Sequence, residues 1–236
     1  MKKVSVVLLA AFSIAFAALA DAAPKRRTRN ANRVGPYGMG FIGQSNWTSD
    51  QSLNELDLIA TLEETGADIQ NLSTSSEDSD MGYNLTFGYR FTRYFAAELG
   101  LAQFGSVESV ARADMDFDGT GFVPVALNLS FSAGGPMFSA LGILPINDKF
   151  ELFGRVGYLF TSSKRELNSR VDGQRGGFGS ARGDSQDLVL GVGAAWNFNQ
   201  VYSARLEYQK LDELGEDNVT GLEDLNVIGL GVVVRF

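Results

Sequence analysis

Residues 225–236 read LNVIGLGVVVRF, and their spacing is the strongest structural signal in the chain. Apolar side chains recur at every second position, which is the period of a β-strand. One face of the expected strand is wholly apolar and carries Ile228, Leu230, Val232, Val234 and Phe236. We therefore expect an amphipathic strand that closes on an aromatic side chain.

The first 22 residues have the features of an export signal. Lys2 and Lys3 precede an apolar run at residues 4–19, and small residues follow it, including Ala20 and Ala22. A charged n-region, an apolar h-region and an A-x-A-like site are typical of a secretory signal peptide. We expect residues 1–22 to be removed on export and residues 23–34, which contain KRRTRNANR, to form a basic periplasmic tail.

Composition limits both the fold and the classes of function. No segment after residue 19 is long and apolar enough for a membrane-spanning helix, so a membrane protein with this sequence must be a β-barrel. A formal net charge of −8 argues against nucleic-acid binding. The sequence has no histidine, which excludes Ser–His and Asp–His hydrolytic sites, and no cysteine, which excludes disulfides.

Several segments alternate bulky apolar residues with glycine or charged residues. The clearest lie at residues 37–47, 81–91, 94–101, 149–161, 188–198 and 202–209. In the first of them the bulky face carries Tyr37, Met39, Phe41 and Trp47. Because these faces are large and often aromatic, we expect them to contact lipid, while the opposite faces line a narrow lumen. The expected interfacial girdles comprise Trp47, Tyr89, Tyr94, Tyr158, Trp196, Tyr202 and Tyr208.

Short and long connections alternate along the chain. Thr92–Arg93, Pro145–Asp148 and Asn199–Gln200 are short, whereas residues 48–80, 166–184 and 211–224 are expected to be long loops. Short periplasmic turns and long external loops are typical of outer-membrane barrels, and this order puts both termini in the periplasm.

Residues 94–118 and 122–144 are expected to form one long hairpin around the sequence DGTG at residues 118–121. A spanning strand needs only about 9–11 residues, so both arms can project beyond the bilayer. We predict an all-β, antiparallel, up-and-down transmembrane barrel of eight strands over residues 35–236. A further hairpin inside the membrane would instead give ten strands.

Six charged residues fall on the faces that should line the lumen. They are Arg90, Glu98, Glu151, Arg155, Arg205 and Glu207. Buried charges are costly unless they are paired, so we expect these side chains to neutralise one another. A gated path for small solutes is the alternative interpretation of the same residues.

The order and spacing of four segments resemble the OmpA-like family of small outer-membrane barrels. They are ELG (98–100), LPINDKFELFGRVGY (144–158), ARLEYQK (204–210) and VIGLGVVVRF (227–236). The resemblance implies a monomer that periplasmic chaperones and the barrel-assembly machinery insert, with Leu230, Val232, Val234 and Phe236 as the assembly signal. It also implies that inward Glu and Arg residues pair across a plugged or narrowly conducting lumen.

The chain departs from the family pattern at two places. Leu141 stands where family members can carry an inward lysine, so the charge network is expected to be incomplete there. Because nothing follows Phe236, we do not expect the peptidoglycan-binding domain of longer members or a wall-tethering role.

Three further motifs have weaker functional interpretations. Asp114, Asp116 and Asp118 match the start of a calcium loop, but Val125 replaces its bidentate glutamate. Arg182–Asp184 form an RGD tripeptide in an expected exposed loop. In the acidic first loop, Leu53, Leu56, Ile59, Ala60 and Leu62 have near-helical spacing, which suggests a short cap or partner-binding helix.

We therefore predict a non-enzymatic, cofactor-free protein of a Gram-negative outer membrane with a structural or surface-interaction role. Its expected partners are outer-membrane lipids and lipopolysaccharide. The alternative is a narrow channel for ions or small solutes. An enzyme that uses carboxylates alone, such as Glu98 with Glu207, is a third class.

Overall fold

The computed structural model describes residues 33–48, 59–60, 62–77, 79–214 and 223–236. Strands dominate this part of the chain. They are β1 (Gly35–Thr48), β2 (Asp68–Glu77), β3 (Ser79–Arg90), β4 (Phe95–Asp116), β5 (Val123–Pro145), β6 (Phe150–Val171), β7 (Gln174–Asn197), β8 (Tyr202–Leu214) and β9 (Glu223–Arg235). None of the helices within the described residues is long and apolar enough to cross a membrane.

Eight of these strands form a closed antiparallel ring. Their order is β4-β3-β1-β9-β8-β7-β6-β5, and pairing between β4 and β5 closes the circle. β2 lies outside the ring and pairs only with the distal part of β4, from Asp68↔Asp116 to Glu77↔Glu108. The prediction of an eight-stranded antiparallel barrel is confirmed, while β2 is a strand inside the segment predicted to be a loop.

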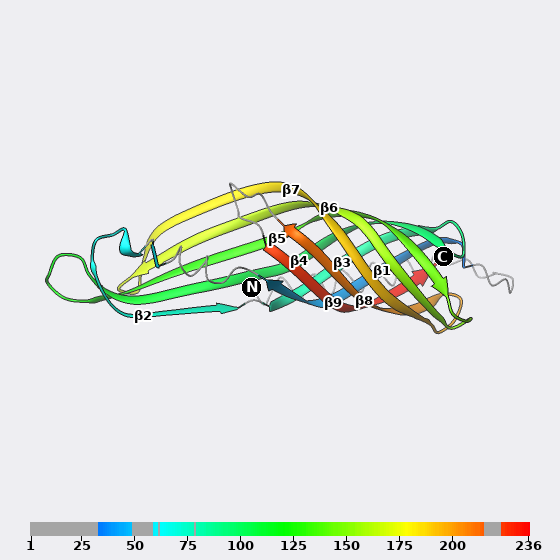
Figure 1. Ribbon diagram of the computed structural model, residues 1–236, viewed down its shortest axis with the longest axis horizontal. Coiled ribbons are helices and arrows are strands. Elements are labelled where there is room, and N and C mark those ends of the chain that lie inside the picture. Colours follow the sequence, from blue (N-terminus) through cyan, green and yellow to red (C-terminus); the bar gives the residue numbers. More distant parts are fainter. Residues whose placement is uncertain (1–32, 49–58, 61, 78, 215–222) are drawn as a thin grey trace.

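The barrel continues into a projecting sheet at one end (Figure 1). β4, β5, β6 and β7 contain 22, 23, 22 and 24 residues, about twice what a bilayer requires. The hairpin predicted over residues 94–118 and 122–144 is confirmed as β4 and β5. We use "projecting end" for this end of the barrel and "turn end" for the other.

The prediction of a loop at residues 166–184 is wrong, because β6 and β7 run through it. They are joined by Asp172 and Gly173, whose φ values are 48° and 73°. Two central residues with positive φ form the type I′ turn that matches the twist of paired strands. The Asp–Gly pair therefore lets both strands extend to the tip of the hairpin.

The turn end is closed by the predicted short connections. Asn147 Oδ1 accepts hydrogen bonds from the backbone N–H of Lys149 (2.8 Å) and Phe150 (2.9 Å). Asn199 Oδ1 does the same for Val201 and Tyr202, both at 2.8 Å. These side chains occupy backbone donors that the turns would otherwise leave unpaired, which favours tight connections.

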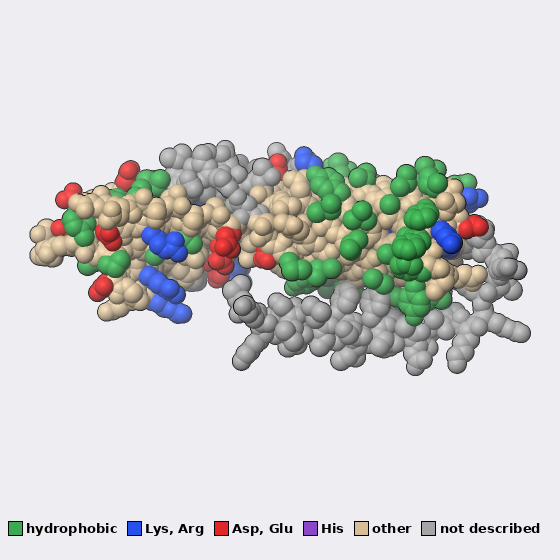
Figure 2. Space-filling model, turned by 90° about the horizontal axis from the view of Figure 1, so that it is seen from below, with side chains coloured by type: hydrophobic (Ala, Val, Ile, Leu, Met, Phe, Trp, Pro, Cys, Tyr) green, Lys and Arg blue, Asp and Glu red, His purple; other side chains and the backbone are tan. Residues whose placement is uncertain are grey.

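The outer wall of the ring is apolar, as predicted for most strands. Figure 2 shows hydrophobic side chains gathered over the barrel half and charged side chains on the projecting half. Exposed bulky residues on the wall include Phe87, Leu101, Tyr158, Val192, Trp196 and Leu230. On β9, Ile228 and Val232 are exposed as well, whereas Val234 is buried.

The predicted orientation of β1 is wrong. Tyr37, Met39, Phe41 and Trp47 are all buried, at 0–3% exposure, so Trp47 does not belong to an interfacial girdle. The reason is tertiary, because Tyr37 hydrogen-bonds a buried carboxylate and the Trp47 ring packs edge-on against Phe131 at 5.5 Å. The remaining predicted girdle residues, Tyr89, Tyr94, Tyr158, Trp196, Tyr202 and Tyr208, are exposed.

A cluster of apolar side chains lies on the inner face of the projecting sheet. Its buried members are Leu62, Ala111, Ala113, Met115, Val125, Leu127 and Leu129. Residues 59–60 and 62–63 are helical, and Leu62 is 2% exposed. Part of the predicted first-loop helix therefore packs on this sheet, while Leu53 and Leu56 lie outside the described residues.

Candidate functional site in the barrel lumen

Glu98 lies at the centre of a buried charge cluster inside the ring. Strand alternation turns this β4 residue inward, where its Oε2 is 2.7 Å from Arg155 Nη2 and its Oε1 is 2.6 Å from Arg205 Nη1. The Tyr37 hydroxyl donates a hydrogen bond to the same Oε1 at 2.6 Å. One carboxylate thus joins β1, β4, β6 and β8 across the lumen.

Arg155 carries the cluster on to a second carboxylate. Its Nε lies 2.5 Å from Glu207 Oε1, its Nη2 donates to Glu207 Oε2 at 3.2 Å, and its Nη1 donates to Ser139 Oγ at 2.8 Å. Gln209 Nε2 also donates to Glu207 Oε1, at 3.1 Å. Nε and Nη2 thus contact both oxygens of Glu207, and this bidentate arrangement makes a buried arginine–carboxylate pair favourable.

Arg205 is held by aromatic rings as well as by Glu98. Its guanidinium carbon lies 5.3 Å from the centre of the Tyr37 ring and 5.1 Å from that of Phe153. Cations over aromatic faces gain electrostatic stabilisation, more so when desolvated. The four predicted residues Glu98, Arg155, Arg205 and Glu207 thus form a single cluster with two positive and two negative charges.

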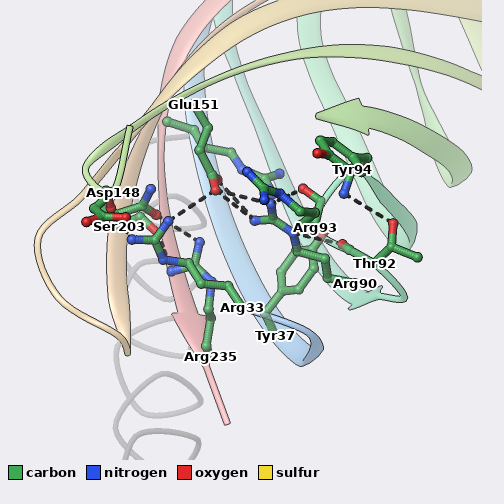
Figure 3. Close-up of polar contacts among 12 residues, drawn as sticks. Arg33, Tyr37, Arg90, Thr92, Arg93, Tyr94, Asp148, Glu151, Ser203 and Arg235 are labelled. Atoms are coloured by element: carbon green, nitrogen blue, oxygen red, sulfur yellow. Dashed lines mark hydrogen bonds and ion pairs between the residues drawn. The ribbon is translucent and has the colours of Figure 1, made fainter. Parts of the chain in front are cut away.

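Arg90 and Glu151 form a separate cluster at the turn end (Figure 3). Arg90 Nη1 is 3.1 Å from both oxygens of Glu151, and Arg33 Nη1 is 3.1 Å from Glu151 Oε1. Arg90 also donates to the backbone carbonyls of Thr92 (3.2 Å) and Arg93 (2.5 Å). This pair therefore fixes the β3–β4 turn and does not share partners with Glu98.

Sequence reasoning did not single out several members of these clusters. Arg235 donates to Ser203 Oγ at 2.7 Å and to Asn197 Oδ1 at 3.1 Å, which ties β9 to β8 and β7. Its place opposite the apolar face of residues 225–236 was a usable signal. Tyr37 was assigned to the wrong face, while Arg33 and Ser139 had no distinguishing pattern.

Apolar side chains fill the lumen on the projecting side of the central cluster. Phe104 lies further along β4 than Glu98, and Leu159 lies further along β6 than Arg155. Both are buried in one cluster with Trp47, Phe131, Val189, Leu211, Leu225 and Val227. A barrel of eight strands is just wide enough for side chains to fill it.

Leu141 is fully buried and pairs with Arg155 across the β5–β6 ladder. The lumen position at which we expected an incomplete network is therefore apolar. Arg155 obtains its partners from Glu98, Glu207 and Ser139 instead.

The aspartates of the calcium-like motif are used in local hydrogen bonds. Asp114 accepts from Asn71 Nδ2 at 2.8 Å, and Asp116 accepts from the N–H of Gly119 at 2.7 Å. The Thr120 hydroxyl donates to Asp118 at 2.5 Å and lowers the pKa of that carboxyl. Over the described ranges, no group of three or more potential metal-binding side chains comes together.

The RGD tripeptide lies within a strand and not in a loop. Arg182 and Asp184 pair with Lys164 and Ser162 in the β6–β7 ladder, and the carbonyl of Gly183 accepts a hydrogen bond from Ser163 Oγ at 3.0 Å. The predicted exposed loop was wrong because Asp172–Gly173 moves the turn away from this tripeptide.

The sequence profile of the OmpA-like transmembrane domain matches residues 42–236. The chain belongs to the OmpA-like family. This OmpA-like chain is similar to outer membrane protein A of Yersinia pseudotuberculosis, with 26% identity over 239 residues, and of Klebsiella aerogenes, with 25% over 243. Both alignments cover 100% of this chain and 56% of the relative, so the chain spans little more than half the length of these relatives.

Solved structures of other small barrels are similar at a distance. OprG of Pseudomonas aeruginosa gives a TM-score of 0.47 at 15% identity, and covers 86% of this chain and 97% of that one. Ail of Yersinia pestis gives 0.38 at 14% identity, with 86% and 99% covered.

Family membership confirms three predictions made from the sequence. The chain is a bacterial outer-membrane β-barrel, it is OmpA-like, and the family consists of non-enzymatic membrane barrels. The OmpA-like barrel is therefore assigned a place in the bacterial outer membrane.

Proposed function

We propose that this OmpA-like barrel is closed to solutes and acts as a structural or surface-interaction protein. The observation that carries this proposal is the filling of the lumen by a neutral charge cluster and an apolar cluster in series. Glu98, Arg155, Arg205 and Glu207 occupy the middle, with side chains 0–7% exposed. Trp47 and Phe131 belong to the apolar side chains on the projecting side.

Each layer opposes permeation for a different physical reason. In the central layer, a hydrated ion would have to break buried ion pairs, and water could not compensate for their loss. In the apolar layer it would lose its hydration shell without compensation. Two such barriers in series support a closed barrel that acts through its surface and not through its lumen.

The proposal also includes the cleavage of the signal peptide, the orientation of the barrel in the membrane and its partners. Residues 1–22 act as a signal peptide, residues 23–34 as a periplasmic tail, and residues 35–236 as the barrel, with both termini in the periplasm. The projecting sheet then faces the exterior. Outer-membrane lipids and lipopolysaccharide surround a monomeric barrel, and the barrel-assembly machinery, with periplasmic chaperones, recognises its terminal strand.

Planar-bilayer conductance tests the closed lumen. Purified barrel inserted into a bilayer should give no discrete openings at moderate voltage. A large porin inserted in the same bilayer is the positive control. Discrete openings of the unaltered protein would overturn the proposal.

A narrow ion path is the second candidate, and unpaired polar atoms favour it. Among the described residues, the buried atoms without a hydrogen-bond partner include Asn84 Nδ2, Asn197 Nδ2, Ser45 Oγ and Gln209 Oε1. Such atoms commonly bind ordered water, and a chain of ordered water molecules through the lumen would provide a path for ions. Openings that disappear on Glu98→Ala or Arg205→Ala would favour this candidate.

A further inference from the structure

The projecting half of β7 is a sheet edge. Residues 174–186, which we name the β7 edge, pair with β6 on one side. β8 pairs with β7 only from Val189 onward, and nothing else in the described part of the chain pairs with the β7 edge. Unpaired strand edges present a row of backbone donors and acceptors, which proteins usually protect.

Two glycines in the β7 edge, Gly177 and Gly179, have no structural requirement that would explain them. Gly177 and Gly179 do not have positive φ. A Cβ added to either would find its nearest neighbour at 3.6 Å and 3.9 Å, which is ordinary contact. Glycine inside a strand weakens it, and commonly marks a place where another backbone approaches closely.

Like charges face each other along the same two strands. Arg170 pairs directly with Arg175, and Lys164 pairs directly with Arg182. Arg170, Arg175 and Arg182 are exposed, whereas Lys164 forms an ion pair with Glu166. Like charges directly opposite each other in a ladder destabilise it.

A bulge places the two edge arginines on one face. The β6–β7 register shifts between Asn168 and Arg170, so that β7 has one extra residue there. An unbroken strand would put Arg175 and Arg182 on opposite faces. With the extra residue, both lie on the outer face with their β6 partners. An acidic strand laid along the β7 edge would find two cations on its own face.

We propose that the β7 edge binds an extended peptide segment of a partner protein that carries acidic side chains at alternate positions. This proposal rests on the surface-interaction role proposed above. The unpaired backbone groups supply main-chain hydrogen bonds by strand addition. Arg175 and Arg182 select acidic side chains, and these carboxylates relieve the repulsion in the β6–β7 ladder.

Binding of synthetic peptides to the detergent-solubilised full-length barrel tests the proposal. The probe is a fluorescent peptide of about ten residues with alternating glutamate and threonine, followed by fluorescence anisotropy. One control replaces glutamate by lysine, and a second keeps glutamate but carries N-methyl groups on alternate amides, which removes backbone donors. We expect both controls to bind at least about tenfold more weakly than the probe.

Variants of the barrel separate the edge from general surface charge. Arg175→Glu with Arg182→Glu should weaken probe binding at least about tenfold, because both edge cations are reversed. Arg112→Glu is the matched control. It lies in the same row of the outer face but on β4, between β2 and β5, and should change binding less than about twofold.

Heat-modifiable gel migration should be unchanged in all variants. The two β7 substitutions lie opposite Arg170 and Lys164, and Arg112→Glu changes an exposed position opposite Ser73 and Ala126. No binding of the probe, equal binding of the N-methylated peptide, or equal loss in Arg112→Glu would each overturn the proposal. A conducting lumen would overturn the closed-barrel function but would leave these binding results unaffected, so the two failures can be distinguished.

Discussion

Glu98 is the residue on which the charge balance of the lumen depends. It forms ion pairs with Arg155 and Arg205 and accepts a hydrogen bond from Tyr37, and both arginines are buried with it. Paired in this way, the four central charges cancel. Unpaired, any of them would be a buried charge in a low-dielectric interior.

Replacing Glu98 by Gln should therefore lower the free energy of unfolding by about 3–5 kcal/mol. The change keeps the shape of the side chain but removes the carboxylate that pairs with Arg205, while Arg155 keeps Glu207. Urea unfolding of the folded barrel in detergent measures the loss. Glu108→Gln, on the projecting part of β4, is the control and should change stability by less than about 0.5 kcal/mol. Equal effects of the two changes would contradict the central role of Glu98.

The two tryptophans give a direct measurement of which side of the wall each residue faces. Trp47 is 3% exposed in the lumen, and Trp196 is 49% exposed on the outer wall. In bilayers of brominated lipid, Trp196 fluorescence in a Trp47→Phe variant should be strongly quenched. Trp47 fluorescence in a Trp196→Phe variant should be largely retained. Similar quenching of both would restore the orientation of β1 that the sequence pattern predicted.

At the scale of the element, the long strands have two distinct environments. Their proximal parts face lipid and lumen, whereas their distal parts form an open sheet with its own apolar cluster. The β4–β5 register shifts between Gln103 and Ser106, where Gly105 has a φ of 78°. This irregularity marks the boundary between ring and projection, and suggests that the two parts are separable.

Deleting residues 107–131 and joining Ser106 to Ser132 through Asn–Gly should leave the ring intact. The remaining arms still exceed the length that a bilayer requires, and Asn–Gly supplies a two-residue hairpin turn. Heat-modifiable migration and the β-sheet circular dichroism signal measure the outcome. A deletion of equal size inside the ring, residues 187–211, should abolish both. Loss of folding in the first variant would show that the projecting sheet is required to form the barrel.

At the scale of the whole molecule, the first strand of the ring, β1, pairs with its last strand, β9. β9 pairs with β1 from Tyr37↔Arg235 to Thr48↔Asp224, and the N–H of Phe236 donates to the carbonyl of Pro36 at 3.2 Å. The last strand thus contributes to closure as well as to the proposed assembly signal.

Removing Phe236 should separate these two contributions. We expect assembly by the reconstituted barrel-assembly machinery to slow severalfold, because the aromatic residue of the proposed signal is lost. Spontaneous refolding into detergent should be nearly unchanged, since a single terminal hydrogen bond contributes about 1 kcal/mol. The fraction of heat-modifiable protein over time measures both rates. Equal slowing in the two systems would show that Phe236 acts in folding and not in recognition.

Periodicity in the amino-acid chain and the spacing of its segments were sufficient to predict the barrel, the short connections at the turn end and the four central charges. Side chains in a strand alternate strictly between two faces, so Glu98, Arg155, Arg205 and Glu207 could be assigned to the lumen without coordinates. The same rule failed for β1, because its bulky side chains face the lumen while its outer face carries Gly38, Gly40 and Ile42. Hydrophobicity alone does not distinguish lipid from a packed lumen.

Three features depended on contacts between residues far apart in the chain. The Tyr37–Glu98 hydrogen bond turned β1 inward, Arg90 and Glu151 paired at the turn end away from the central charges, and β2 added to the distal part of β4. A local pattern specifies which side chains share a face of a strand, since this follows from the backbone of that strand. Which partner it meets across the lumen, or across a sheet edge, depends on register and closure, and these exist only once all the strands have assembled.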